Sequence, residues 1–149
     1  MHIRKSIVAV LALAGATVSA SEYLTEGYDN GRTGWVRDEK VFTTANVPNM
    51  KLLWKLKLDS TPRSMHNLFP PLIAEKVTTA QGTKEIGVVA GVTDDLFGID
   101  LATGQQIWKK HFEGYSVPPV DNVLCPGGQT AVPTIAQVSP GKYTVYAVS

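Results

Sequence analysis

Apolar and polar residues alternate through residues 52–58 (LLWKLKL). The even positions from Leu52 to Leu58 share one face and include Trp54, whereas the odd positions include Lys55 and Lys57. Successive side chains of a strand point to opposite faces, so this period of two predicts a half-buried β-strand.

A series of short apolar segments follows, separated by turn residues at Gln81-Gly82, residues 93–95 and residues 102–104. Glycine and aspartate favour tight turns, and Pro71 is tolerated at the first position of a strand. The pattern predicts four strands, at residues 71–78, 85–92, 96–100 and 106–112. Four short strands joined by hairpin turns form an antiparallel meander, which is the arrangement of one β-propeller blade.

The same pattern then begins again. The segment PTIA at residues 133–136 echoes PLIA at residues 71–74, and YTVYAV at residues 143–148 echoes the strand that begins at residue 86. Two Trp-Lys pairs, which begin at Trp54 and Trp108, also recur along the chain. Internal repetition of this kind is typical of a repeat architecture, and it argues against a generic secreted β-sandwich.

The first twenty residues have the features of a secretory signal peptide. Arg4 and Lys5 precede an apolar run at residues 7–15, and small residues at 18–20 fit a cleavage site before Ser21. The apolar run is too short to cross a bilayer, so we expect no membrane span after cleavage. We therefore expect a periplasmic or secreted protein.

Composition narrows the classes of partner. The 149 residues are 44% hydrophobic and 18% charged, which is typical of a globular chain, and the formal net charge is +1. This balance gives no reason to expect a nucleic-acid partner. The single cysteine, Cys125, has no partner in the chain for a disulfide, and we expect it to be inert or structural.

Residues 96–109 (LFGIDLATGQQIWK) resemble the repeat of quinoprotein-like β-propellers, the repeat of pyrroloquinoline quinone enzymes. Asp100, Thr103, Gly104 and Trp108 match that repeat, and Gly98 replaces its usual alanine. The resemblance extends over about residues 27–149. The matching residues have structural explanations, because aspartate and glycine stabilise the turn and a tryptophan ring can lie between adjacent blades.

The resemblance implies an all-β fold, namely a partial β-propeller of four-stranded antiparallel blades. Residues 1–20 would be the signal peptide, residues 21–51 a lead-in, and residues 52–149 an incomplete propeller of about one and a half blades plus a closing strand that carries Trp54. A propeller needs four to eight blades, so the expected partners are the missing blades of a longer chain. As a fragment, the chain is expected to be unstable or to associate through exposed strand edges.

The resemblance implies two functions. Some propellers of this kind bind pyrroloquinoline quinone with Ca²⁺ and oxidise alcohols or sugars, whereas others are binding scaffolds without a cofactor. Enzymes of this family carry a glutamate just before the first blade, where this chain has Leu68, and often adjacent cysteines where it has only Cys125. We therefore expect a binding or scaffold propeller, which would take a protein partner or a small alcohol or sugar. The alternative is the N-terminal part of a quinone-dependent dehydrogenase.

Few side chains are candidates for ligand binding. Arg63, His66 and Asn67 lie in the loop before the first predicted blade, where polar groups could reach a central channel. We expect the Asp94-Asp95 pair to be ordinary turn residues rather than a metal site, because Ca²⁺ needs six or more oxygen ligands. His111, at a strand end, is expected to be exposed. The sequence indicates no catalytic residue.

Overall fold

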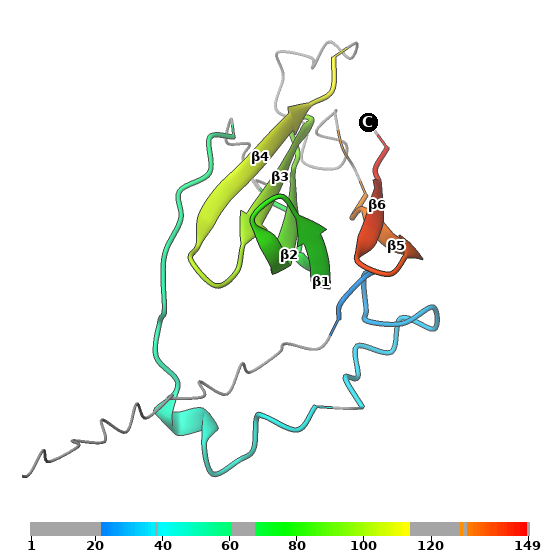
Figure 1. The fold of residues 1–149 in the computed structure, drawn as a ribbon. Helices are drawn as coiled ribbons and strands as arrows, with labels where there is room; N and C mark the ends of the chain where they lie inside the picture. The colour runs from blue at the N-terminus through cyan, green and yellow to red at the C-terminus, as the bar shows by residue number, and fades with distance from the viewer. Residues whose placement is uncertain (1–21, 38, 61–67, 114–128, 130, 149) are drawn as a thin grey trace, which may run out of the picture.

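Two antiparallel sheets form the regular structure of the chain (Figure 1). The computed structural model describes residues 22–37, 39–60, 68–113, 129 and 131–148. The first sheet has the order β1-β2-β3-β4, and its strands are β1 (Leu72–Thr79), β2 (Gly82–Gly91), β3 (Asp95–Asp100) and β4 (Gln105–His111). The second sheet consists of β5 (Thr134–Ser139) and β6 (Lys142–Tyr146).

The predicted meander is confirmed, with strand ends within three residues of their expected positions. Each strand pairs with the next along the chain, and the pairs are antiparallel throughout. The remaining regular element of the described residues is a 3-10 helix at Val47–Asn49. The fold is therefore all-β, as the sequence predicts.

The two central strands are buried on both faces. Every residue of β3 is buried, as are the last six residues of β2, whereas every residue of β4 is exposed to some degree. One face of β2 carries Ile86, Val88 and Ala90, which form a core cluster with residues of β1 and with Ile135 of β5. The opposite face includes Phe97, whose side chain is fully buried. Buried and exposed residues therefore do not alternate along β3, because both faces of this strand are covered.

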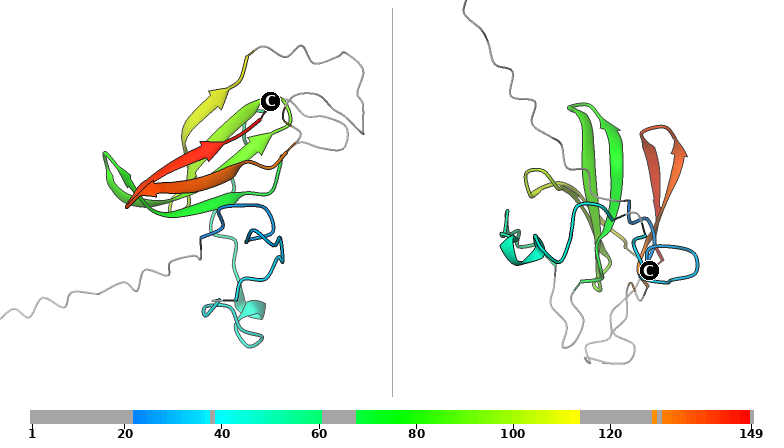
Figure 2. Two further views of the ribbon diagram at one scale, coloured as in Figure 1. Left: turned by 90° about the vertical axis from the view of Figure 1, so that its right-hand side faces the viewer. Right: turned by 90° about the horizontal axis from the view of Figure 1, so that it is seen from below.

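A short N-terminal segment joins the two sheets. Tyr23 exchanges two backbone hydrogen bonds with Ile73 of β1, with N–O distances of 2.9 and 2.8 Å. The carbonyl of the next residue, Leu24, accepts a hydrogen bond of 2.7 Å from the amide of Ile135. The chain at residues 23–24 thus runs between β1 and β5, the neighbouring strands of the two sheets (Figure 2).

The strand expected at residues 52–58 is not formed. These residues belong to neither sheet, and Leu52 is 82% exposed. The alternation itself is present, because Trp54, Leu56 and Leu58 are half-buried while the two lysines are exposed. A period of two predicts which face is covered, but a strand also needs a backbone partner, and this segment has none among the described residues.

No helix in the described part of the chain is long and apolar enough to cross a membrane. The expected signal peptide lies outside the described residues.

Replacement of Phe97 by alanine should destabilise the protein strongly, because it removes a fully buried ring from the centre of the sheet. We expect the free energy of unfolding in urea to fall by about 3–5 kcal/mol. The matched control is Phe42→Ala, at a ring that is 52% exposed, which should cost less than about 1 kcal/mol. Equal losses for the two variants would contradict this description of the core.

Candidate functional site

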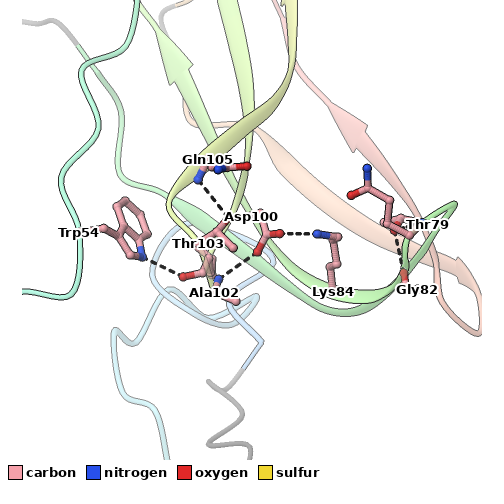
Figure 3. Close-up of polar contacts among 10 residues, drawn as sticks. Trp54, Thr79, Gly82, Lys84, Asp100, Ala102, Thr103 and Gln105 are labelled. Carbon is pink, nitrogen blue, oxygen red and sulfur yellow. Dashed lines mark hydrogen bonds and ion pairs between the residues drawn. The ribbon is translucent and has the colours of Figure 1, made fainter.

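The turn between β3 and β4 is held by the carboxylate of Asp100. This carboxylate accepts hydrogen bonds from Lys84 Nζ at 2.5 Å and from the amide of Ala102 at 3.0 Å (Figure 3). The amide of Gly104 donates to the carbonyl of Asp100 at 2.8 Å. The hydrogen bond from Lys84 is the main reason that the pKa of Asp100 lies below its ordinary value.

Trp54 lies against this turn from outside the sheet. Its Nε1 donates a hydrogen bond of 2.9 Å to the carbonyl of Leu101, and its ring lies over Gly104. A Cβ atom at Gly104 would lie 2.5 Å from Trp54 Cδ2, and Gly104 has a φ of 70°. Two independent constraints therefore require glycine here: the left-handed backbone and the contact with the indole ring.

The chain that follows Trp54 continues along β4. Lys109 Nζ donates to the carbonyl of Asp59 at 2.7 Å and lies 5.4 Å from the centre of the Phe97 ring. At the far end, the hydroxyls of Ser60 and Thr93 are 3.2 Å apart. Residues 54–60 thus cover one face of the sheet, and these contacts account for the half-buried even positions of the segment.

Trp108 lies on the opposite face of the sheet. It is paired with Gly98 of β3, and a Cβ atom at Gly98 would overlap the indole ring. This contact gives a physical reason for glycine where the resembling repeat has alanine. The Trp108 side chain is 36% exposed, and its Nε1 donates no hydrogen bond among the described residues.

A cleft of about 610 Å³ lies beside Trp108, between the two sheets. Its lining includes apolar side chains of both sheets and the Lys84–Asp100 ion pair. The apolar part of its lining includes Ile86 and Trp108 on the first sheet, and Ile135 and Val145 on the second. The lining of the cleft thus combines polar and apolar side chains, and the indole N–H of Trp108 has no hydrogen-bond partner among the described residues.

The Asp94-Asp95 pair is buried, and Asp94 lies in the turn between β2 and β3, as expected, while Asp95 begins β3. The two residues are 3% and 5% exposed. Asp95 Oδ1 lies 3.0 Å from His111 Nδ1 and 3.2 Å from Lys109 Nζ. Both partners of Asp95 come from β4, which adjacency in sequence does not predict. The side chain of His111 is 56% exposed, as expected.

Asp94 is a buried carboxylate with incomplete hydrogen bonding. Its φ is 65°, and its Oδ1 has no partner among the described residues. Burial is the main reason that its pKa lies above the ordinary value, and a backbone hydrogen bond from Gln129 lowers it in part. The side-chain amide of Gln129 is also buried, with no partner among the described residues. No group of three potential metal-ligating side chains occurs in the part of the chain that the structure describes.

The candidate ligand-binding residues Arg63, His66 and Asn67 lie outside the described residues, as does Cys125. Leu68, which replaces the expected glutamate, is 47% exposed and forms an isolated bridge with Gly91.

The structure brings together four of the five residues predicted for the repeat motif. Trp54, Asp100, Thr103 and Gly104 gather at one turn, where the amide of Gln105 also donates to Thr103 Oγ1 at 3.3 Å. Trp108, the fifth, lies on the cleft instead.

Sequence reasoning missed two polar residues. Lys84 lies opposite Asp100 in space, although the two are sixteen residues apart. Tyr143 donates to Glu22 at 2.6 Å, and burial raises the pKa of Tyr143 to about 12. A search for charge pairs across the predicted hairpins could have found Lys84, whereas the contact from Glu22 to Tyr143 spans 121 residues and carries no local signal.

Comparisons with protein-family models, curated proteins and solved structures find no match to this chain.

Replacement of Trp54 by phenylalanine should weaken the attachment of residues 54–60 to the sheet. The variant loses the hydrogen bond from Nε1 to the Leu101 carbonyl, so we expect the free energy of unfolding to fall by about 1–2 kcal/mol. Trp35→Phe is the matched control, because Trp35 is 63% exposed, and it should change the value by less than about 0.5 kcal/mol. A Trp54→Phe variant as stable as the parent would show that the hydrogen bond is not formed in solution.

Replacement of Asp94 by asparagine should stabilise the protein at pH 7. A carboxyl whose pKa is raised by burial binds a proton more tightly in the folded state, so stability falls as pH rises through its pKa. Asparagine removes this penalty and tolerates a positive φ. We expect the gain over the parent to disappear as pH is lowered toward about 4, the pKa of an unfolded aspartate.

The measurement is urea unfolding from pH 4 to pH 8. The control is Asp59→Asn, at an exposed carboxylate, which should change the free energy of unfolding by less than about 0.5 kcal/mol. A loss of stability in Asp94→Asn at pH 7 would contradict the assignment of Asp94 as a buried group with a raised pKa.

Proposed function

We propose that this chain is an exported binding module, a piece of a quinoprotein-like β-propeller scaffold with no catalysis of its own. The observation that carries the proposal is the contact of Trp54 with the Asp100–Gly104 turn. Both partners belong to the motif for which the sequence resembles that repeat, and they meet through a hydrogen bond and a ring contact that need no ligand.

The four-stranded sheet supports the proposal as well. It has the strand order and size of a propeller blade, and a second pair of strands lies beside its first strand. Binding propellers use their blades as rigid supports, and the buried central strands β2 and β3 suit that role. The partners proposed are further blades of the same kind, together with a protein or small molecule bound by the completed scaffold.

The alternative function, the N-terminal part of a pyrroloquinoline quinone-dependent dehydrogenase, has less support. Such a cofactor would itself accept the hydride from an alcohol or sugar, and the protein would orient it beside a general base. The residue at the position of the family's glutamate is Leu68, which offers no carboxylate. Asp95, which begins β3 at the end of the sheet near Leu68, is already paired with His111 and Lys109.

The test is a titration of the purified chain with pyrroloquinoline quinone and Ca²⁺, followed by quinone absorbance and by alcohol-dependent dye reduction. For a binding module we expect neither saturable binding nor dye reduction. An apo-dehydrogenase known to bind the quinone serves as positive control. Saturable binding with alcohol-dependent dye reduction would overturn the proposal in favour of the enzyme.

A further inference from the structure

Asp94 contacts both ends of the connection between β4 and β5. Its carbonyl accepts a hydrogen bond of 2.9 Å from the amide of Phe112, the residue directly after β4. Its carboxylate accepts a second backbone hydrogen bond, from the amide of Gln129, shortly before β5 begins. Phe112 and Val132 also pack against the core cluster that the two sheets share. One aspartate in the β2–β3 turn therefore holds the main chain where it leaves the first sheet and where it approaches the second.

The side chains at this contact are buried with incomplete hydrogen bonding. Asp94 is 3% exposed and Gln129 is 0% exposed. Oδ1 of Asp94 and both polar atoms of the Gln129 amide, Oε1 and Nε2, have no hydrogen-bond partner among the described residues. Most buried polar groups in folded proteins are paired, because leaving one unpaired costs its full desolvation penalty. This pair is therefore expected to have a state in which its hydrogen bonding is more complete.

A proton on Asp94 supplies the missing donor. An ionised carboxylate only accepts hydrogen bonds, whereas a protonated carboxyl also has an O–H that can donate to Oε1 of Gln129. The other carboxyl oxygen can keep accepting from the amide of Gln129, and that main-chain hydrogen bond keeps the two side chains close together. Burial, the main cause, raises the pKa of Asp94 and thereby favours the protonated form.

The charged groups around Asp94 come from three elements. Asp95, which begins β3, raises the pKa of Asp94, whereas His111 on β4 lowers it. Lys109, also on β4, binds the carboxylate of Asp95 at 3.2 Å and the carbonyl of Asp59 at 2.7 Å. His111 Nδ1 lies 3.0 Å from the same oxygen of Asp95. Both cationic side chains therefore pair with Asp95, and Oδ1 of Asp94 has no such partner among the described residues.

We propose that Asp94 is a proton-operated clamp that fixes the β2–β3 turn to the connection between β4 and β5. With the carboxyl protonated, Asp94 holds Gln129 through both the main chain and the side chain. With the carboxyl ionised, Oδ1 is buried without a donor, and the contact with Gln129 is weaker. The junction between the two sheets therefore tightens as pH falls. The clamp uses none of the residues of the Trp54 contact, so its failure would leave the proposed function untouched.

The experiment measures hydrogen exchange of backbone amides in the ¹⁵N-labelled protein from pH 4 to pH 8, corrected for the intrinsic effect of pH on exchange. The carboxyl of Asp94 is titrated in the same samples through its ¹³C chemical shift. A carboxyl with a raised pKa stabilises the folded contact below its unfolded pKa, and that stability is lost as pH rises through the folded value. We expect the protection of the Gln129 amide to fall about tenfold over this titration, the size of one hydrogen bond.

Gln129→Met distinguishes the clamp from a carboxyl that is merely buried. The variant keeps the main-chain hydrogen bond to Asp94 and removes the side-chain acceptor. We expect its amide at position 129 to be about tenfold less protected than that of the parent at pH 4, and equally protected at pH 8.

Asp94→Asn imitates the protonated state at every pH, because its amide group both donates and accepts and because asparagine tolerates the φ of 65°. We expect high protection of Gln129 without pH dependence. His111→Gln is the matched control, since histidine also changes charge between pH 5 and 8, and it should keep the pH dependence of the parent.

Three results would overturn the proposal. The first is an Asp94 carboxyl that is already ionised at pH 4, which the parent protein reports without any variant. The second is a pH dependence that His111→Gln removes, which would assign it to the imidazole. The third is a Gln129→Met variant as well protected as the parent at pH 4, which would show that the side chain of Gln129 does not share the proton.

Discussion

The burial of β2 and β3 on both faces is the constraint on which the rest of this structure depends. Apolar side chains point to both sides of these strands, so each side needs a cover that excludes water. On one side, residues 54–60 supply it, fixed by Trp54 at one end and by Asp59 and Ser60 at the other. On the other side, the β5–β6 pair supplies it, joined through the backbone of residues 23–24. Both covers come from outside the four-stranded sheet, so the burial of its central strands depends on segments that pack onto it.

The tryptophans of the two Trp-Lys pairs lie on opposite faces of the four-stranded sheet. Trp54 closes one face of the sheet on a turn whose glycine leaves room for the ring, and Trp108 presents the same kind of ring on the opposite face.

Much of the fold could be predicted, and the failures have physical causes. Short apolar segments between glycine- and aspartate-containing turns were enough to locate the strands, because turn chemistry and strand alternation are local properties. The Asp100–Gly104 turn was predicted for the same reason. The strand predicted at residues 52–58 was not formed. An alternation of apolar and polar residues indicates that one face of a segment is covered, but it does not indicate that a neighbouring strand is present to form backbone hydrogen bonds. The contacts of the Asp95 carboxylate were missed, because its partners Lys109 and His111 lie fourteen or more residues away on another strand.

By itself the sequence determined the all-β class, the order of the strands, the turn with its required glycine, and a repeated tryptophan. Each of these follows from interactions between residues close in the chain, or from direct repetition. Only the tertiary structure decided which face each tryptophan covers, that Lys84 neutralises Asp100, and that residues 23–24 lie between the sheets. These features depend on which surfaces meet when the two sheets and the N-terminal segment pack together. Packing of that kind brings together residues up to 121 positions apart, for which no local pattern exists.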